Sequence, residues 1–126
     1  MRSVVISAVL AVVVIAGSLM YTNNLEKVSR ELSHINEQVA ECLEKDDYTG
    51  AEVGVERLSA YLDRKRAMLD AIGNHEEMDK IEMNISELAE YTRGKQKADA
   101  LSRNHVLDFL FEHLPLNYKL KFENIL

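Results

Sequence analysis

The sequence predicts an all-α protein in which an N-terminal transmembrane helix continues into an antiparallel, up-and-down bundle of about four helices. Residues 4–21 carry no charge, later apolar residues recur every three or four positions, and the chain has only five Gly and one Pro. That spacing marks one face of a helix, and few helix breakers favour long helices. We divide the chain into an anchor (residues 1–24), a bundle (25–115) and a C-terminal tail (116–126).

The anchor segment, VVISAVLAVVVIAGSLMY, is long enough to cross a membrane. At about 1.5 Å per residue it spans roughly 27 Å, close to a hydrocarbon core of about 30 Å. A cleaved signal peptide is the alternative, because Arg2 precedes the apolar run and residues 16–18 are small, as a signal peptidase requires. We favour an uncleaved anchor because the apolar run continues to Tyr21.

The charges that flank the anchor indicate its orientation. Arg2 and the amino terminus favour an N-terminus inside the cell, whereas Lys27 and Arg30 on the other side weaken that signal. We therefore expect a single-pass protein of the cell membrane with its C-terminal domain extracytoplasmic. The lipid bilayer is then its first partner.

Charge and motif content exclude several classes of function. The formal net charge of −6 argues against a nucleic-acid partner. The sequence has no nucleophile with a neighbouring base, no Gly-rich phosphate loop, and no HExxH or CxxC spacing. We expect neither enzymatic activity nor a cofactor.

The first bundle helix is predicted to leave the anchor without a break, as one helix of about forty residues. No Gly or Pro separates the two parts. Cys42 lies at the end of its apolar stripe, either as a small buried side chain or as a cross-chain disulfide in a parallel homodimer. The stripe comprises Leu25, Val28, Leu32, Ile35, Val39 and Cys42.

Two further helices follow. Asp47 is a good N-cap for the second helix, Gly73 and Asn74 are expected to end it, the third helix starts at Asn74 or His75, and Gly94 ends the third. The second stripe comprises Ala51, Val55, Leu58, Leu62, Leu69 and Ile72. The third comprises Met78, Ile81, Ile85 and Leu88.

The fourth helix is predicted to run from about Lys95 to Leu114, where Pro115 ends it. Its second half carries apolar residues over roughly 200° of its circumference, more than one core-facing stripe requires. It is therefore either the most buried helix or a surface for a second copy or another membrane protein. The tail alternates apolar and polar residues and is predicted to be extended, with aromatic residues beside lysines as at a membrane interface. The candidate interaction surface comprises Val106, Phe109, Phe111, Tyr118 and Phe122.

The up-and-down topology places the start of the third helix beside the end of the fourth, near the membrane. His75, Glu77 and His113 would then lie close together, where they could bind a divalent metal or respond to pH. Alternatively, the two histidines only stabilise the adjacent helix ends.

Residues 48–126 resemble a family of small, N-terminally anchored proteins of Gram-positive bacteria, domain of unknown function 4363. The resemblance rests on the anchor and on short motifs in the third helix, the fourth helix and the C-terminus. They are His75 and Glu77, Asp79-Lys80-Ile81-Glu82, Leu110 and His113, and Asn124-Ile125-Leu126. The chain departs from the family pattern at Tyr61, where members tend to carry Trp, and at Leu116-Asn117, where they carry an acidic residue. The resemblance implies a location and a fold but no activity.

Two function classes remain. A membrane-anchored scaffold or protein-interaction module of the cell envelope agrees with the packing and anchoring signals that dominate the sequence. A ligand- or metal-binding sensor is the alternative, and it would use the His/Glu cluster near the membrane.

Overall fold

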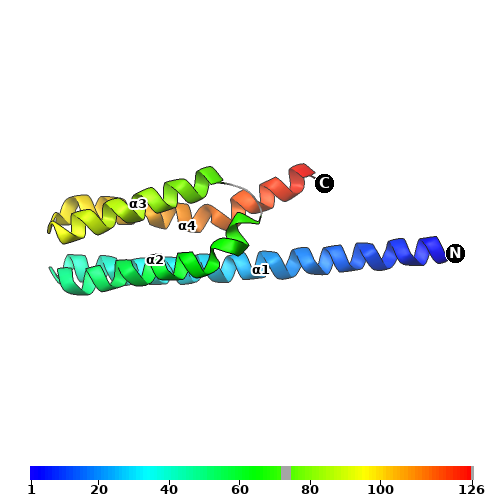
Figure 1. The fold of residues 1–126 in the computed structure, drawn as a ribbon, viewed down its shortest axis with the longest axis horizontal. Coiled ribbons are helices and arrows are strands. Elements are labelled where there is room, and N and C mark those ends of the chain that lie inside the picture. Colours follow the sequence, from blue (N-terminus) through cyan, green and yellow to red (C-terminus); the bar gives the residue numbers. More distant parts are fainter. Residues whose placement is uncertain (72–74, 126) are drawn as a thin grey trace.

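The computed structural model confirms the all-α fold. Its helices are α1 (Arg2–Glu44), α2 (Tyr48–Asp70), α3 (His75–Arg93) and α4 (Lys97–Ile125) (Figure 1). The structure describes residues 1–71 and 75–125, and within them it describes side chains as far as Leu114. No strand occurs among the described residues.

The helices form the predicted antiparallel, up-and-down bundle. α1 packs against α2 and α4, and α3 packs against the same two helices, so each helix contacts two neighbours around one core. Figure 1 shows the N-terminal half of α1 projecting from the bundle. The C-terminal end of α4 points toward the same end of the molecule.

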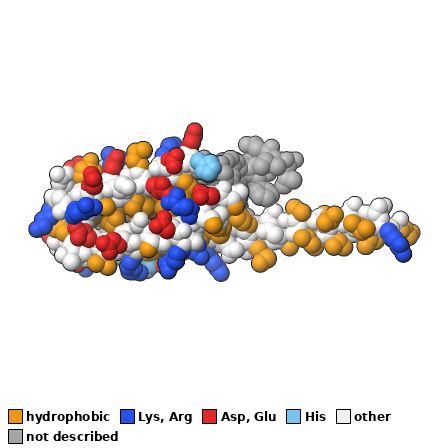
Figure 2. Space-filling view, viewed as in Figure 1, with side chains coloured by type: hydrophobic (Ala, Val, Ile, Leu, Met, Phe, Trp, Pro, Cys, Tyr) orange, Lys and Arg blue, Asp and Glu red, His pale blue; other side chains and the backbone are white. Residues whose placement is uncertain are grey.

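α1 is one uninterrupted helix of 43 residues, as expected. The side chains of its first turns are uncovered, and Val4 is 70% exposed. Figure 2 shows hydrophobic side chains along this projecting part, whereas on the bundle Asp, Glu, Lys and Arg side chains are interspersed with hydrophobic ones. The hydroxyl groups of Ser7, Ser18 and Thr22 donate to the carbonyl oxygens four residues earlier, at 2.8 to 2.9 Å. The few polar side chains of the apolar segment are therefore satisfied within the helix.

Leu25 is the first fully buried residue of α1, and Tyr21, one turn earlier, is already half-buried against the core. The predicted stripe is buried as far as Val39, but its last position is wrong: Cys42 is half-buried and Leu43 is fully buried instead. A helix of 3.6 residues per turn drifts by about 20° per heptad from a three-four alternation, which brings Leu43 into the core by the last turn. The stripes of α2 and α3 are buried as predicted, except that Ile72 lies outside the described residues.

Two turns of three residues, 45–47 and 94–96, close the end of the bundle far from the anchor, and we call them the apical turns. Their middle residues, Asp46 and Lys95, have φ angles of 58° and 56°. In each turn the third residue donates its N–H to the carbonyl five residues earlier, at 2.8 Å, and the middle residue donates to the carbonyl three residues earlier, at 3.1 Å. α1 and α3, which lead into these turns, therefore both end in a Schellman motif.

The ends of α2 are only partly as predicted. Asp47 caps its start, because its carboxylate accepts the N–H of Gly50 at 2.9 Å. At the other end α2 stops at Asp70. The predicted stop at Gly73 and Asn74 lies outside the described residues.

The prediction that Pro115 ends the fourth helix is wrong, and so is the extended tail over residues 116–125, because α4 continues to Ile125. Proline has no N–H to donate to the carbonyl of Phe111, four residues earlier. The hydroxyl group of Ser29 on α1 donates to that carbonyl instead, at 2.5 Å, inside the bundle. A contact from a neighbouring helix thus satisfies the acceptor that the proline leaves free.

A buried pair of amides lies two turns further from the anchor, and we call it the polar core pair. Asn36 on α1 and Asn104 on α4 are 0% and 1% exposed. The Nδ2 of Asn36 donates to the carbonyl of Asn104 at 2.9 Å and to Oδ1 of Asp108 at 2.6 Å. The Nδ2 of Asn104 donates to the carbonyl and to Oδ1 of Asn36, at 2.8 and 2.9 Å. The pair fixes how far α1 and α4 slide along each other.

α1 and α2 lie close together at Gly54, which is buried. A Cβ atom at this position would lie 2.6 Å from Cγ2 and 3.8 Å from Cα of Val39. The absence of a side chain at Gly54 therefore lets α1 and α2 pack closely, although glycine is a weak helix former within α2.

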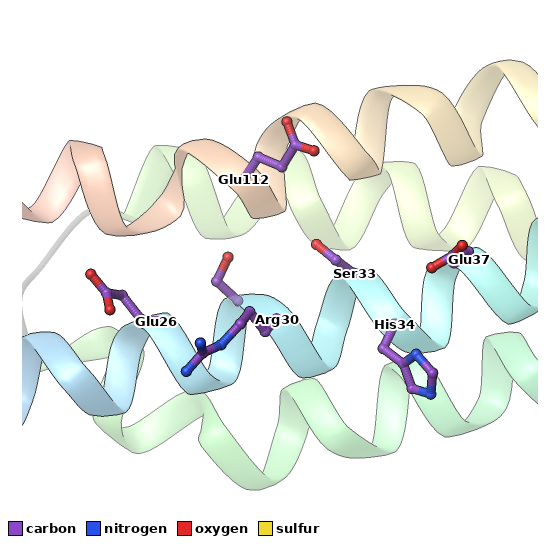
Figure 3. A pocket seen from close by; sticks show the side chains of 7 residues that line it. Glu26, Arg30, Ser33, His34, Glu37 and Glu112 are labelled. Atoms are coloured by element: carbon purple, nitrogen blue, oxygen red, sulfur yellow. The ribbon is translucent and has the colours of Figure 1, made fainter.

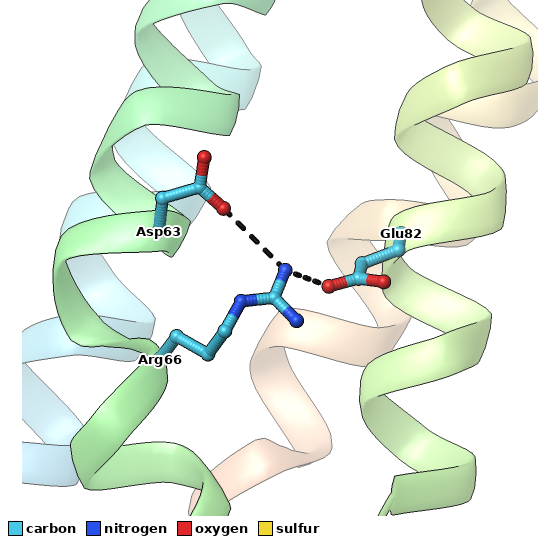
Figure 4. Close-up of polar contacts among 3 residues, drawn as sticks. All are labelled: Asp63, Arg66 and Glu82. Atoms are coloured by element: carbon cyan, nitrogen blue, oxygen red, sulfur yellow. Dashed lines mark hydrogen bonds and ion pairs between the residues drawn. The ribbon is translucent and has the colours of Figure 1, made fainter.

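Ion pairs join the helices at the surface. Arg66 on α2 contacts Glu82 on α3 and Asp63 on its own helix, the latter at 3.4 Å (Figure 4). At the apical turns, Nζ of Lys97 lies 3.3 Å from Oδ1 of Asp46. Such exposed pairs add little stability, so the apolar core and the buried hydrogen bonds determine the fold.

Candidate functional site

An open groove of about 560 Å³ runs between α1 and α4, and we call it the acidic groove. Its polar lining carries three carboxylates, one guanidinium and one imidazole. The lining residues are Glu26, Ser29, Arg30, Ser33, His34 and Glu37 from α1 and Glu112 from α4.

The charged groups of the acidic groove do not converge on one point. Figure 3 shows Glu26 and Glu37 at opposite ends of the row on α1, about 16 Å apart along the helix. Glu112 lies across the groove on α4, and its carboxyl group points away from α1 (Figure 3). Nor does any group of three His, Cys, Asp or Glu residues in the described part of the chain lie close enough to hold a metal ion. The groove suits an extended partner better than a small ion.

The predicted interaction surface on α4 divides into exposed and buried residues. Val106 and Phe109 are exposed, and Phe109 is 59% exposed. Phe111 was assigned to this surface, and that assignment is wrong, because its side chain is fully buried in the core. The side chains of Tyr118 and Phe122 lie outside the described part. Of the predicted surface, Val106 and Phe109 therefore remain available to a partner.

The ring of His113 stacks on Phe109, with 4.1 Å between the ring centroids. Its Nδ1 lies 2.8 Å from the carbonyl of Phe109, which can only accept, so Nδ1 carries the proton and donates. Only Nε2 of His113 is left to bind a metal or a partner. His113 therefore belongs to the exposed aromatic surface of α4.

The structure does not gather the three predicted metal ligands into a site. His75 is exposed at the start of α3, and Glu77 is half-buried two residues later. Among the described residues, Oε2 of Glu77 is buried without a hydrogen-bond partner. Neither residue forms with His113 a group that could hold a metal ion.

Tyr61 lies half-buried on α2, at the seam with α1. Burial raises its pKa above the ordinary value of 10.0, the negative charge of Glu31 raises it further, and Arg64 lowers it. The guanidinium carbon of Arg64 and Nζ of Lys65 lie 5.6 and 5.8 Å from the ring centre. Cation–π contacts with the ring of Tyr61 therefore position the Arg64 and Lys65 side chains at the bundle surface.

The sequence did not predict the polar residues inside the bundle. Ser29, Asn36 and Asn104 are buried, although none of them belongs to a predicted apolar stripe. A signal was present, because Ser29 and Asn36 are seven residues apart and adjoin the apolar stripe of α1. Their partners on α4, Phe111 and Asn104, are also seven residues apart.

A model of one protein family, described as Domain of unknown function (DUF4363), matches residues 19–125. The match covers α1 from Leu19 onward and the whole of α2, α3 and α4. No curated protein and no solved structure matches the chain.

Proposed function

The chain belongs to this family of domains of unknown function, and on that premise we propose that it is a single-pass membrane protein whose bundle stands outside the cytoplasm and serves as a docking module for other proteins. The observation that carries the proposal is the form of α1. One helix presents an uncovered apolar half and then, without a break, a half that is buried in the bundle.

The apolar half of α1 supports membrane anchoring. It is the one described helix that is long and apolar enough to cross a membrane, and none of its most apolar stretch is buried within the bundle. Uncovered apolar side chains in such number are unfavourable in water, at about 25 cal/mol per Å² of apolar surface. A bilayer removes this cost.

The surface of the bundle supports the role in docking. Phe109 is uncovered on α4, and Val106 is exposed one turn before it. An exposed aromatic side chain is a frequent anchor in protein interfaces. The partner is a second copy of this chain or another membrane protein, because both are held alongside it by the same bilayer.

The alternative, a ligand- or metal-binding sensor, is the weaker proposal. It was based on His75, Glu77 and His113, which do not form a metal-binding group. Metal analysis of the purified full-length chain tests it directly: stoichiometric metal that is lost in His113→Ala would favour the sensor.

The orientation is tested with two single-cysteine variants in a Cys42→Ser background. The variants are Lys45→Cys and Ser3→Cys. Lys45 is exposed in an apical turn, and Ser3 is exposed at the other end of α1. We expect a membrane-impermeant maleimide to label Lys45→Cys in intact cells and Ser3→Cys only after lysis. The reverse pattern would invert the topology, and a mature chain that lacks residue 3 would show signal cleavage.

The docking role is tested by photo-crosslinking from Phe109, with Val53 on α2 as the matched control. The two side chains are 59% and 53% exposed. A photoreactive residue at position 109 is expected to capture a protein that position 53 does not capture. An adduct of twice the chain mass would identify a homodimer, whereas the same adducts from both positions, or none from either, would contradict the proposal.

A further inference from the structure

The membrane-proximal end of the bundle carries a set of cations at a defined height. The hydroxyl group of Tyr21, the last residue of the apolar segment, donates to the carbonyl of Met68 at 2.7 Å, so the end of α2 lies level with that residue. At about 1.5 Å per residue, Lys65 and Arg64 lie about 4.5 and 6 Å farther from the anchor, and Lys27 on α1 lies about 9 Å farther. We call Lys27, Arg64 and Lys65 the basal collar.

The heights of Lys65 and Arg64 fall within the headgroup layer of a bilayer, and Lys27 lies just above it. The apolar core is about 30 Å thick, and the whole bilayer is about 40–45 Å thick, which leaves roughly 5–8 Å of headgroups on each side. If the apolar core ends near Tyr21, the long side chains of the basal collar reach this layer.

The collar is free to bind an anion. Lys27 and Arg64 are exposed and Lys65 is half-buried, and none of the three forms an ion pair with any residue whose side chain the structure describes. Tyr61 holds the charges of Arg64 and Lys65 beside its ring. Figure 2 shows Lys and Arg side chains along the lower edge of the bundle, where Figure 1 places α1 and α2.

The acidic residues near the basal collar do not neutralise its positive charge. Glu26 lines the acidic groove on the flank of α1 that faces α4, and Asp63 is engaged by Arg66 at 3.4 Å. Glu31 acts on Tyr61, where it raises the pKa, and Asp70 lies half-buried at the end of α2, but the three cations outnumber these two acids. Glu76 and Glu77 open α3, which packs mainly against α2 and α4 rather than against α1. The collar is thus a basic surface on a chain whose net charge is −6.

We propose that the basal collar binds the headgroups of anionic lipids in the leaflet that the bundle faces. The inference rests on the proposed membrane anchoring and adds a lipid preference to it. Juxtamembrane lysines and arginines are attracted to anionic leaflets, and the attraction weakens with salt. Binding of the collar to the leaflet would keep the membrane-proximal ends of α1 and α2 close to the membrane.

The test is native mass spectrometry of the full-length chain released from nanodiscs that contain about two parts phosphatidylcholine to one part phosphatidylglycerol. We expect phosphatidylglycerol to remain bound in several-fold excess over its supplied proportion. The triple variant Lys27→Gln, Arg64→Gln and Lys65→Gln is expected to retain the two lipids in the supplied proportion. The matched control is Lys45→Gln, Arg93→Gln and Lys95→Gln, which removes the same charge from exposed residues in or next to the apical turns. We expect this control to retain the excess of phosphatidylglycerol.

The outcomes separate this inference from the proposal on which it rests. A chain that does not enter the mixed nanodiscs overturns the anchoring itself. A chain that enters but binds both lipids in the supplied proportion overturns only the collar, and so does an equal loss in both triple variants. Displacement of the bound phosphatidylglycerol by millimolar inorganic phosphate would show that the collar binds soluble anions, which also overturns the lipid assignment.

Discussion

Asn36 and Asn104 exchange side-chain hydrogen bonds across the interface of α1 and α4, each donating to the backbone carbonyl of the other. A slide of one helix along the other by a single turn would leave both amides buried without partners. The polar core pair therefore selects one register among the several that an apolar core alone would permit.

We expect Asn36→Leu to lower the free energy of unfolding by about 2 kcal/mol, because it leaves acceptors on Asn104 and Asp108 without their donor. Denaturant unfolding of the full-length chain in detergent micelles, followed by circular dichroism, measures the change. The double variant with Asn104→Leu should lose less than the sum of the two single variants. The exposed Asn24→Ala is the control, and strict additivity at positions 36 and 104 would contradict the coupling.

Ser29 and Pro115 are expected to be coupled through the carbonyl of Phe111. Ser29→Ala should cost about 1–2 kcal/mol, because that buried acceptor loses its donor. In a Pro115→Ala background the restored N–H of residue 115 can bond the same carbonyl, so Ser29→Ala should cost much less. A double-mutant cycle by denaturant unfolding measures the difference. Ser33→Ala, one turn further along α1, should have no such coupling.

Gly54→Ala is expected to destabilise the bundle by about 1–3 kcal/mol, since its Cβ would lie 2.6 Å from Cγ2 of Val39. In an open helix position the same change is favourable by up to about 1 kcal/mol. Gly17→Ala provides that control, because nothing lies within 4 Å of its Cβ position. Thermal melts in micelles should therefore show a lower midpoint for Gly54→Ala and no shift for Gly17→Ala, which lies outside the bundle, and a rise for Gly54→Ala would refute the close approach.

Tyr61 should make stability depend on pH in the alkaline range. Its pKa is higher in the folded chain than the ordinary 10.0, so the folded state keeps a proton that the unfolded state loses. Its contribution to the free energy of unfolding is present below pH 10 and is lost as the pH rises above that value. Unfolding measured at pH 8 and above pH 10 should show the wild-type advantage over Tyr61→Phe shrinking. An advantage that grows with pH would show that the pKa is lowered.

The sequence predicts the parts of this fold that depend on local spacing. The stripes from Leu25 to Val39 and from Met78 to Leu88, the cap at Asp47 and the continuity of α1 all follow from periodicity and capping. Each of these signals is contained within a few turns of one helix, so no knowledge of neighbouring helices is needed.

The errors arise where a second helix decides the outcome. Pro115 stops an isolated helix, but the hydroxyl group of Ser29, 86 residues earlier in the chain, allows α4 to continue. Phe111 and Phe109 are equally apolar, and only the stripe through Ala100, Leu107 and Leu114 determines which one is buried. Asn104 interrupts that stripe as a polar residue and hides it from a search for apolar spacing. The prediction of a metal site was wrong for a related reason. Residues at the same end of a bundle need not have their side chains close together.

The unbroken α1 also fixes the height at which a partner can be met. From Tyr21 to Glu44 the helix rises by about 35 Å, so under the proposed anchoring the apical turns stand at that distance from the membrane boundary. Because one continuous helix forms both the apolar segment and the first bundle helix, a tilt or rotation of the proposed anchor would move the whole bundle with it. Under the proposed anchoring the protein would act as a rigid post that holds a partner bound at its tip at one distance from the bilayer.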